Sequence, residues 1–193
     1  SRNFSHIEWN EEQVQKGDFN HFFMKEVVEQ AQVIEKVASI DKKIIKNIAN
    51  EIKNAEDVYV IACGSAFYAG LCGVYMFSKI ASKKVNFCLA SEFNDFKHLI
   101  GKNSLIIAIS QSGETADTLY AIREAKSYGA KIISICNSNN SSLTKESNDI
   151  IFQNAGPEIC VLSTKSYTSQ IAILGLLAYE MNNRLDEGIE KLK

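Results

Sequence analysis

The sequence predicts a three-layer α/β/α sandwich on a mostly parallel sheet of five strands. Short apolar segments, rich in β-branched residues, alternate with longer segments of helical periodicity along most of the 193 residues. The predicted strands are apolar throughout, as expected of strands that helices cover on both faces. No repeat or low-complexity segment interrupts the alternation, so one α/β domain is expected.

The segment before the alternation is expected to contain an arm and two helices. Residues 1–20 are polar, mix charge signs and lack a sustained period, so they are expected to be an arm or linker remnant, and residues 21–193 the domain. Helical periodicity predicts a helix over residues 22–38 and a second over 41–54, with Asp41 as N-cap. The apolar face of the first helix consists of Phe23, Val27, Ala31, Ile34 and Ala38; the residues expected to point inward from the second are Ile44, Ile45, Ile48 and Ile52.

The alternating part follows in order. Strands are expected at residues 58–62, 85–89, 105–109, 131–136 and 149–153. Helices are expected at residues 65–82, 91–99, 115–128 and 163–182, and a loop with a helical turn at residues 137–148.

Composition excludes several functional classes. The formal net charge of -2 gives no overall attraction to nucleic acid or to an anionic membrane surface. No apolar run reaches the roughly 18 residues of a membrane span. The five cysteines are far apart and form no C-x-x-C pair, which indicates reduced thiols rather than a zinc site or disulfides. We therefore expect a cytoplasmic protein without metal or cofactor that binds neither nucleic acid nor membranes.

Residues 110–115 (SQSGET) are the strongest candidate site. They join a predicted strand to a predicted helix, where unpaired amides and the helix dipole favour an anion. Ser110, Ser112 and Thr115 supply three hydroxyls, and Gly113 lets the backbone approach a ligand closely. The absence of Lys and Arg suits a small phosphate monoester better than a polyanion. Alternatively, Ser112 or Thr115 simply caps the helix.

Two further loops are expected at the same edge of the sheet, because ligands of open parallel sheets bind beyond the carboxyl ends of the strands. Residues 63–66 follow the first strand, and residues 156–165 lead into the last helix. The second of these loops holds Pro157, the only proline of the chain, and the charged residues Glu158 and Lys165. Lys165 is interpreted as a structural or interface residue rather than as a reactive amine.

Several motifs resemble the first sugar isomerase (SIS) domain of the glutamine–fructose-6-phosphate aminotransferase family. They are residues 62–65 (ACGS), 110–118 (SQSGETADT), 154–158 (NAGPE) and 163–165 (STK). Residues 21–26 (HFFMKE), with Glu29 and Gln30, are similar to the segment that enters this domain in the family. The resemblance covers residues 21–182 and implies a SIS fold of the flavodoxin-like type.

The resemblance also implies roles for individual residues. The phosphate of a bound sugar would be held by Ser65, Ser110, Gln111, Ser112 and Thr115, and the sugar side of the pocket lined by Val161 and Ser163. Gly64, Gly113 and Glu158 are further candidates. Two positions depart from the family: Ala66 stands where a second hydroxyl is usual, and Cys160 replaces a usual glycine.

The function implied is the binding of fructose 6-phosphate within an enzyme that makes glucosamine 6-phosphate and glutamate from fructose 6-phosphate and glutamine. The glutaminase domain and the second SIS domain of that family have no counterpart in this sequence, so no catalytic residue is assigned and the fragment alone is expected to be inactive. A homodimer is expected, because SIS domains of the family pair. The alternatives are a sugar-phosphate sensor of a regulator and a stand-alone phosphosugar isomerase.

Overall fold

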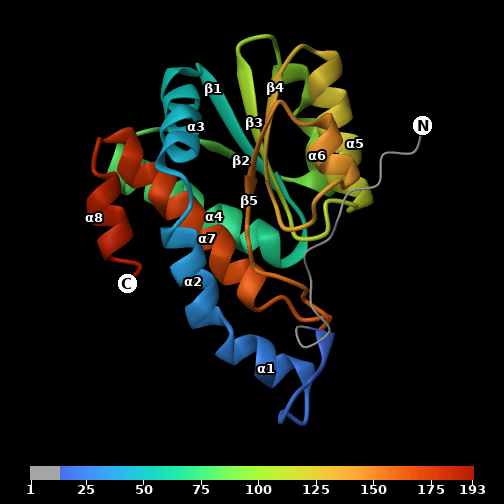
Figure 1. Cartoon of the computed structure of the whole chain (residues 1–193). Coiled ribbons are helices and arrows are strands. Elements are labelled where there is room, and N and C mark those ends of the chain that lie inside the picture. Colours follow the sequence, from blue (N-terminus) through green and yellow to red (C-terminus); the bar gives the residue numbers. More distant parts are fainter. Residues whose placement is uncertain (1–13) are drawn as a thin grey trace, which may run out of the picture.

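The computed structural model describes residues 14–193 and contains a five-stranded, fully parallel sheet (Figure 1). The strands lie in the order β2-β1-β3-β4-β5. Their bounds are Asp57–Ala62 for β1, Asn86–Leu89 for β2, Ser104–Ser110 for β3, Lys131–Cys136 for β4 and Asp149–Phe152 for β5. The predicted fold class and all five predicted strands are confirmed. The expected arm over residues 1–20 lies mostly outside the described residues.

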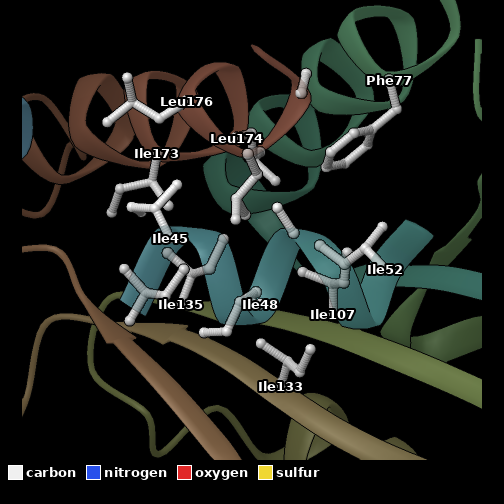
Figure 2. Close-up of a cluster of buried hydrophobic side chains, with 14 of the residues drawn as sticks. Ile45, Ile48, Ile52, Phe77, Ile107, Ile133, Ile135, Ile173, Leu174 and Leu176 are labelled. Carbon is white, nitrogen blue, oxygen red and sulfur yellow. The ribbon is translucent and has the colours of Figure 1, made fainter. Parts of the chain in front are cut away.

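One face of the sheet is covered by α3 (Lys42–Asn54), α4 (Gly64–Ala81) and α7 (Lys165–Met181), with α8 (Leu185–Glu190) beside them. Figure 2 shows side chains of α3, α4, α7 and the strands pointing toward one another. Ile52, Phe77, Ile107 and Leu174 are fully buried there. This apolar layer holds α4 and α7, whose first turns lie at the carboxyl edge of the sheet.

The opposite face carries α5 (Ala116–Ser127), α6 (Ser142–Glu146) and the short 3-10 helices η2 (Ala90–Asp95) and η3 (Lys97–Leu99). Successive residues of β3 point to opposite faces, so Ile107 lies in the first layer and Ile106 in the second. All seven residues of β3 are buried, as expected of a central parallel strand.

The helix predicted over residues 22–38 is interrupted at Glu29, giving α1 (Phe22–Val28) and α2 (Gln30–Ala38). The predicted apolar face was also wrong, because Phe23 is 39% exposed whereas Glu26 is buried. The buried side chains are Glu26, Val33 and Val37. Hydrogen bonds from distant residues to the carboxylate of Glu26 draw this polar side of the helix inward.

Two smaller differences concern α3 and the end of the chain. Ile44 was expected to point inward but is 41% exposed, whereas Ile45, Ile48 and Ile52 are buried as expected. Helix α8 was not predicted. Its Gly188 lies so close to Tyr179 of α7 that an added Cβ would come within 2.9 Å of that side chain.

Within residues 14–193, no helix combines the length and the apolar character needed to cross a membrane. The same residues contain no group of three or more His, Cys, Asp or Glu side chains that could hold a metal ion. All five cysteines are free thiols, as the sequence indicated.

Candidate functional site

The register of the sheet brings the predicted site loops to one edge. Ala62 pairs with Ile109, and Ser110 pairs with Cys136, so the loops after β1, β3 and β4 start side by side. The strand order reverses at β1 and β3, because the chain adds β2 on one side of β1 and β3 on the other. Ligands of open α/β sheets bind at such a reversal.

The serine loop, residues 110–115, is folded around the side chain of Ser110, which is 3% exposed. The amide of Gly113 donates to Ser110 Oγ at 3.0 Å, and Ser110 Oγ lies 3.1 Å from Thr115 Oγ1. The amide of Glu114 donates to Ser112 Oγ at 3.2 Å. The structure therefore gathers all three predicted hydroxyls in one short turn.

The serine loop is fixed to the segment between β4 and α6. Gly113 accepts a backbone hydrogen bond from Leu143 at 3.0 Å, and Gln111 accepts one from Asn137 at 3.2 Å. The carboxylate of Glu114 accepts the amide of Ser142 at 2.7 Å, and this bond is the main reason that the pKa of Glu114 lies below its usual value. These three hydrogen bonds fix the shape of the serine loop.

The structure also bears on the alternative that the serine loop only caps a helix. Thr115 occupies the N-cap position of α5, but no side chain makes a capping hydrogen bond there. The hydroxyl of Thr115 shares a hydrogen bond with Ser110 Oγ instead. Ser112 Oγ accepts the amide of Glu114, which precedes the helix. The hydroxyls of Thr115 and Ser112 therefore do not cap the first amides of α5.

The loop after β1 places Ser65 in the first turn of α4, where its side chain is exposed. Gly64 before it has φ +58°, in the left-handed region, and no atom stands within 4 Å of the position of an added Cβ. Burial raises the pKa of the thiol of the neighbouring Cys63, which favours its protonated form. Ser65 is thus the accessible hydroxyl of this turn.

The loop of residues 156–164, called the 156–164 loop below, leads into α7. Glu158 accepts the amides of Thr164 at 2.9 Å and Ser166 at 3.1 Å, and also the hydroxyl of Ser166 at 2.5 Å. Its carboxylate thereby caps α7. Ser163 Oγ lies 2.7 Å from Ser166 Oγ, and Val161 is fully exposed at the tip of the loop.

Gln153, which sequence reasoning missed, connects these loops. Its side chain is fully buried, and Nε2 donates to the carbonyl oxygens of Ser110 at 3.2 Å and Ile135 at 3.1 Å. Ser169 of α7 donates its hydroxyl to the carbonyl oxygen of Gln153 at 2.7 Å. The start of α7 is therefore coupled to the serine loop. A glutamine that directly follows an apolar strand was the only signal in the sequence.

Lys165 is 3% exposed, and its ammonium lies 2.6 Å from a carboxylate oxygen of Glu29. This partly buried ion pair joins the start of α7 to the junction of α1 and α2. It supports the structural interpretation of Lys165 over a reactive amine.

The SIS domain family model matches residues 51–179, which is more than half of the chain. The chain belongs to the SIS domain family. The matched range runs from the end of α3 to the end of α7 and contains the serine loop, Ser65 and the 156–164 loop.

Several relatives of known name to which the chain is similar are aminotransferases. The glutamine–fructose-6-phosphate aminotransferase (isomerizing) of Clostridium acetobutylicum is 42% identical over an alignment covering 100% of this chain and 34% of the relative. That of Clostridium tetani is 39% identical with the same coverage. The C-terminal domain of glucosamine-fructose-6-phosphate aminotransferase from Francisella tularensis superposes with a TM-score of 0.79 at 29% identity, covering 93% of this chain and 54% of that one. The chain thus spans about a third of the length of these curated relatives.

Proposed function

We propose that this chain is the first SIS domain of a glutamine–fructose-6-phosphate aminotransferase and that it binds fructose 6-phosphate. The observation that carries the proposal is the serine loop, whose three hydroxyls gather at the strand-order reversal without capping α5. The names of the relatives support the identity of the sugar. Residues 21–193 would form this domain.

In the proposed site, hydroxyls and amides bind the phosphate without a cationic side chain. Ser110, Gln111, Ser112 and Thr115 would surround it, and the start of α5 would add the positive end of its dipole. Ser65 would approach from the first turn of α4, which starts next to the serine loop. Such a neutral cradle orients a small dianion and has little attraction for a long polyanion.

The sugar itself would lie toward the 156–164 loop. The backbone of Val161 and the hydroxyl of Ser163 would contact it, Gly64 and Gly113 would allow the backbone to approach, and Glu158 would act by holding the start of α7. In this proposal the domain binds and orients the substrate. The proton transfer between C1 and C2 of the sugar is assigned to the part of the enzyme outside this chain.

The proposal extends to the full enzyme. It would make glucosamine 6-phosphate and glutamate from fructose 6-phosphate and glutamine in the cytoplasm, with a glutaminase domain and a second SIS domain in the same chain. The chain would also pair as a homodimer; exposed aromatic residues on α4, Tyr68 and Tyr75, offer apolar surface for a partner. Light scattering tests the pairing, and a monomer at micromolar concentration would contradict it.

Ser112→Ala and Thr115→Ala are each expected to weaken fructose 6-phosphate binding by about 1 to 2 kcal/mol, the cost of one hydrogen bond to a charged group. The measurement is calorimetric titration of the 193-residue chain with fructose 6-phosphate, glucose 6-phosphate and glucosamine 6-phosphate. Inorganic phosphate and fructose separate the contributions of the two parts of the ligand. Ser127→Ala, which removes an exposed hydroxyl at the far end of α5, is the matched control and should bind like wild type.

Saturable binding of the phosphorylated sugars but not of fructose, weakened in both serine-loop variants, is the expected result. Unchanged affinity in both variants would remove the serine loop from the site. Absence of binding by the wild-type chain would contradict the proposal that this domain binds the sugar phosphate by itself.

A further inference from the structure

The segment that enters the domain holds a buried carboxylate beside the 156–164 loop. Glu26 of α1 is 2% exposed, and its Oε1 accepts the amides of Ile159 at 2.6 Å and Cys160 at 3.1 Å. Its Oε2 is also buried and has no hydrogen-bond partner among the described residues. Burying a carboxylate is unfavourable unless its hydrogen bonds compensate. The hydrogen bonds from the amides of Ile159 and Cys160 therefore explain why the carboxylate of Glu26 can be buried.

The next polar residues of the segment contact α7 and not the loop. Glu29 pairs with the buried ammonium of Lys165 at 2.6 Å, and the side chain of Gln30 accepts the hydroxyl of Thr168. Figure 1 shows α1 next to the loop that leads into α7. The segment thus contacts two different elements. Glu26 binds the 156–164 loop, whereas Glu29 and Gln30 bind α7, the helix that follows it.

The middle of the 156–164 loop lies between two carboxylates. Glu26 fixes the amides of Ile159 and Cys160, and Glu158 fixes the amide of Thr164. Between them, Val161 is fully exposed and Leu162 is 62% exposed, so the core does not hold the tip. The direction in which residues 161–163 point therefore depends on the two carboxylates at the ends.

We propose that Glu26 is a positioning residue for sugar recognition: it fixes the peptide groups of Ile159 and Cys160 so that Val161 and Ser163 face the sugar. The inference rests on the proposed function, which places these two residues on the sugar side of the ligand. The serine loop makes its hydrogen bonds within itself, with the segment between β4 and α6 and with Gln153, and none of these bonds involves Glu26 or residues 159–163. Glu26 therefore acts on the affinity for the sugar part and leaves the affinity for the phosphate part unchanged.

The test compares Glu26→Ala with wild type in the 193-residue chain. The variant is expected to bind fructose 6-phosphate about tenfold more weakly, because the sugar contacts are no longer preorganised. Its affinity for inorganic phosphate, measured by NMR titration, stays the same. Hydrogen exchange of the Ile159 and Cys160 amides becomes faster, which reports directly that the loop has been released.

Gln30→Ala is the matched control, since it removes a polar contact from the same segment to α7. It is expected to lower the melting temperature without changing the ratio of the fructose 6-phosphate and inorganic phosphate affinities. Glu26→Gln keeps the shape and one acceptor oxygen but loses the charge, so about threefold weaker sugar-phosphate binding is expected. If Glu26→Ala does not fold, Glu26→Gln is the variant that tests whether Glu26 positions the loop.

Wild-type affinity for fructose 6-phosphate in Glu26→Ala, with fast exchange at Ile159 and Cys160, would overturn the inference and leave the proposed function intact. An equal loss for inorganic phosphate would also overturn it, because the effect would then not be on the sugar. If the wild-type chain binds no sugar phosphate, the proposed function fails and this inference fails with it. With Glu26→Gln as the only folded variant, unchanged affinity would overturn the inference.

Discussion

Gly113→Ala is expected to lower the free energy of unfolding by about 3 kcal/mol, the sum of a left-handed backbone strain and an overpacked core. Gly113 has φ +69°, and an added Cβ would come within 2.2 Å of Ser141 Oγ and 2.8 Å of Cys136 Sγ. Relief of this overlap would move the serine loop away from β4 and α6. The amide of Gly113 would then leave Ser110 Oγ, so fructose 6-phosphate binding should be lost as well.

Urea unfolding and calorimetric titration with fructose 6-phosphate measure the two effects. Gly64→Ala is the matched control, because Gly64 also has a positive φ, +58°, but no atom lies within 4 Å of its added Cβ. It should cost only about 1 kcal/mol, from backbone strain alone. Equal losses of stability in the two variants would show that contact with Ser141 and Cys136 is not what requires glycine at position 113.

The sheet could be predicted from the sequence because its strands are covered on both faces. Such strands are continuous apolar runs, and the predicted residues 105–109 lie within the observed β3, Ser104–Ser110. The apolar run was sufficient to recognise each strand, because the neighbouring strands did not have to be known. The strand order followed only from the structure.

The first helices show why side-chain patterns were insufficient elsewhere. The apolar residues Phe23 and Ala31 suggested one face, but the buried face contains Glu26, Val33 and Val37. An analysis of periodicity assigns a glutamate to the exposed face of a helix. The burial of Glu26 depends instead on amides more than 130 residues away in the sequence. Helix α8 was missed for a related reason: its position depends on close packing of Gly188 against α7.

The candidate site divides in the same way. The hydroxyls of the serine loop are adjacent in the sequence, so their convergence could be predicted from residues 110–115 alone. Gln153 and Glu26 act through backbone groups of distant segments, and nothing in their neighbours along the chain indicated those partners. Glu158 stood out in the sequence as a charge near the cleft, but its role as the cap of α7 required the structure.

Glu158→Ala is expected to lower the free energy of unfolding by about 2 to 3 kcal/mol, more than an ordinary helix cap, because its charged carboxylate accepts several hydrogen bonds. The variant leaves the amides of Thr164 and Ser166 without this acceptor at the start of α7, a helix of 17 residues. Ser163 would also be held less firmly, because its Oγ shares a hydrogen bond with Ser166 Oγ, which in turn donates to Glu158. Fructose 6-phosphate binding should therefore weaken together with stability.

Glu146→Ala provides the comparison for urea unfolding of this variant. Glu146 pairs with Arg123 at 3.2 Å and Lys126 at 3.4 Å on the surface, where ion pairs contribute up to about 1 kcal/mol. A loss in Glu158→Ala no larger than in Glu146→Ala would mean that water satisfies the start of α7 as well as the carboxylate does. Wild-type stability combined with lost sugar-phosphate binding would instead make Glu158 a ligand contact. The structural role predicts that both properties decline together, because the same carboxylate that caps α7 also fixes the end of the 156–164 loop.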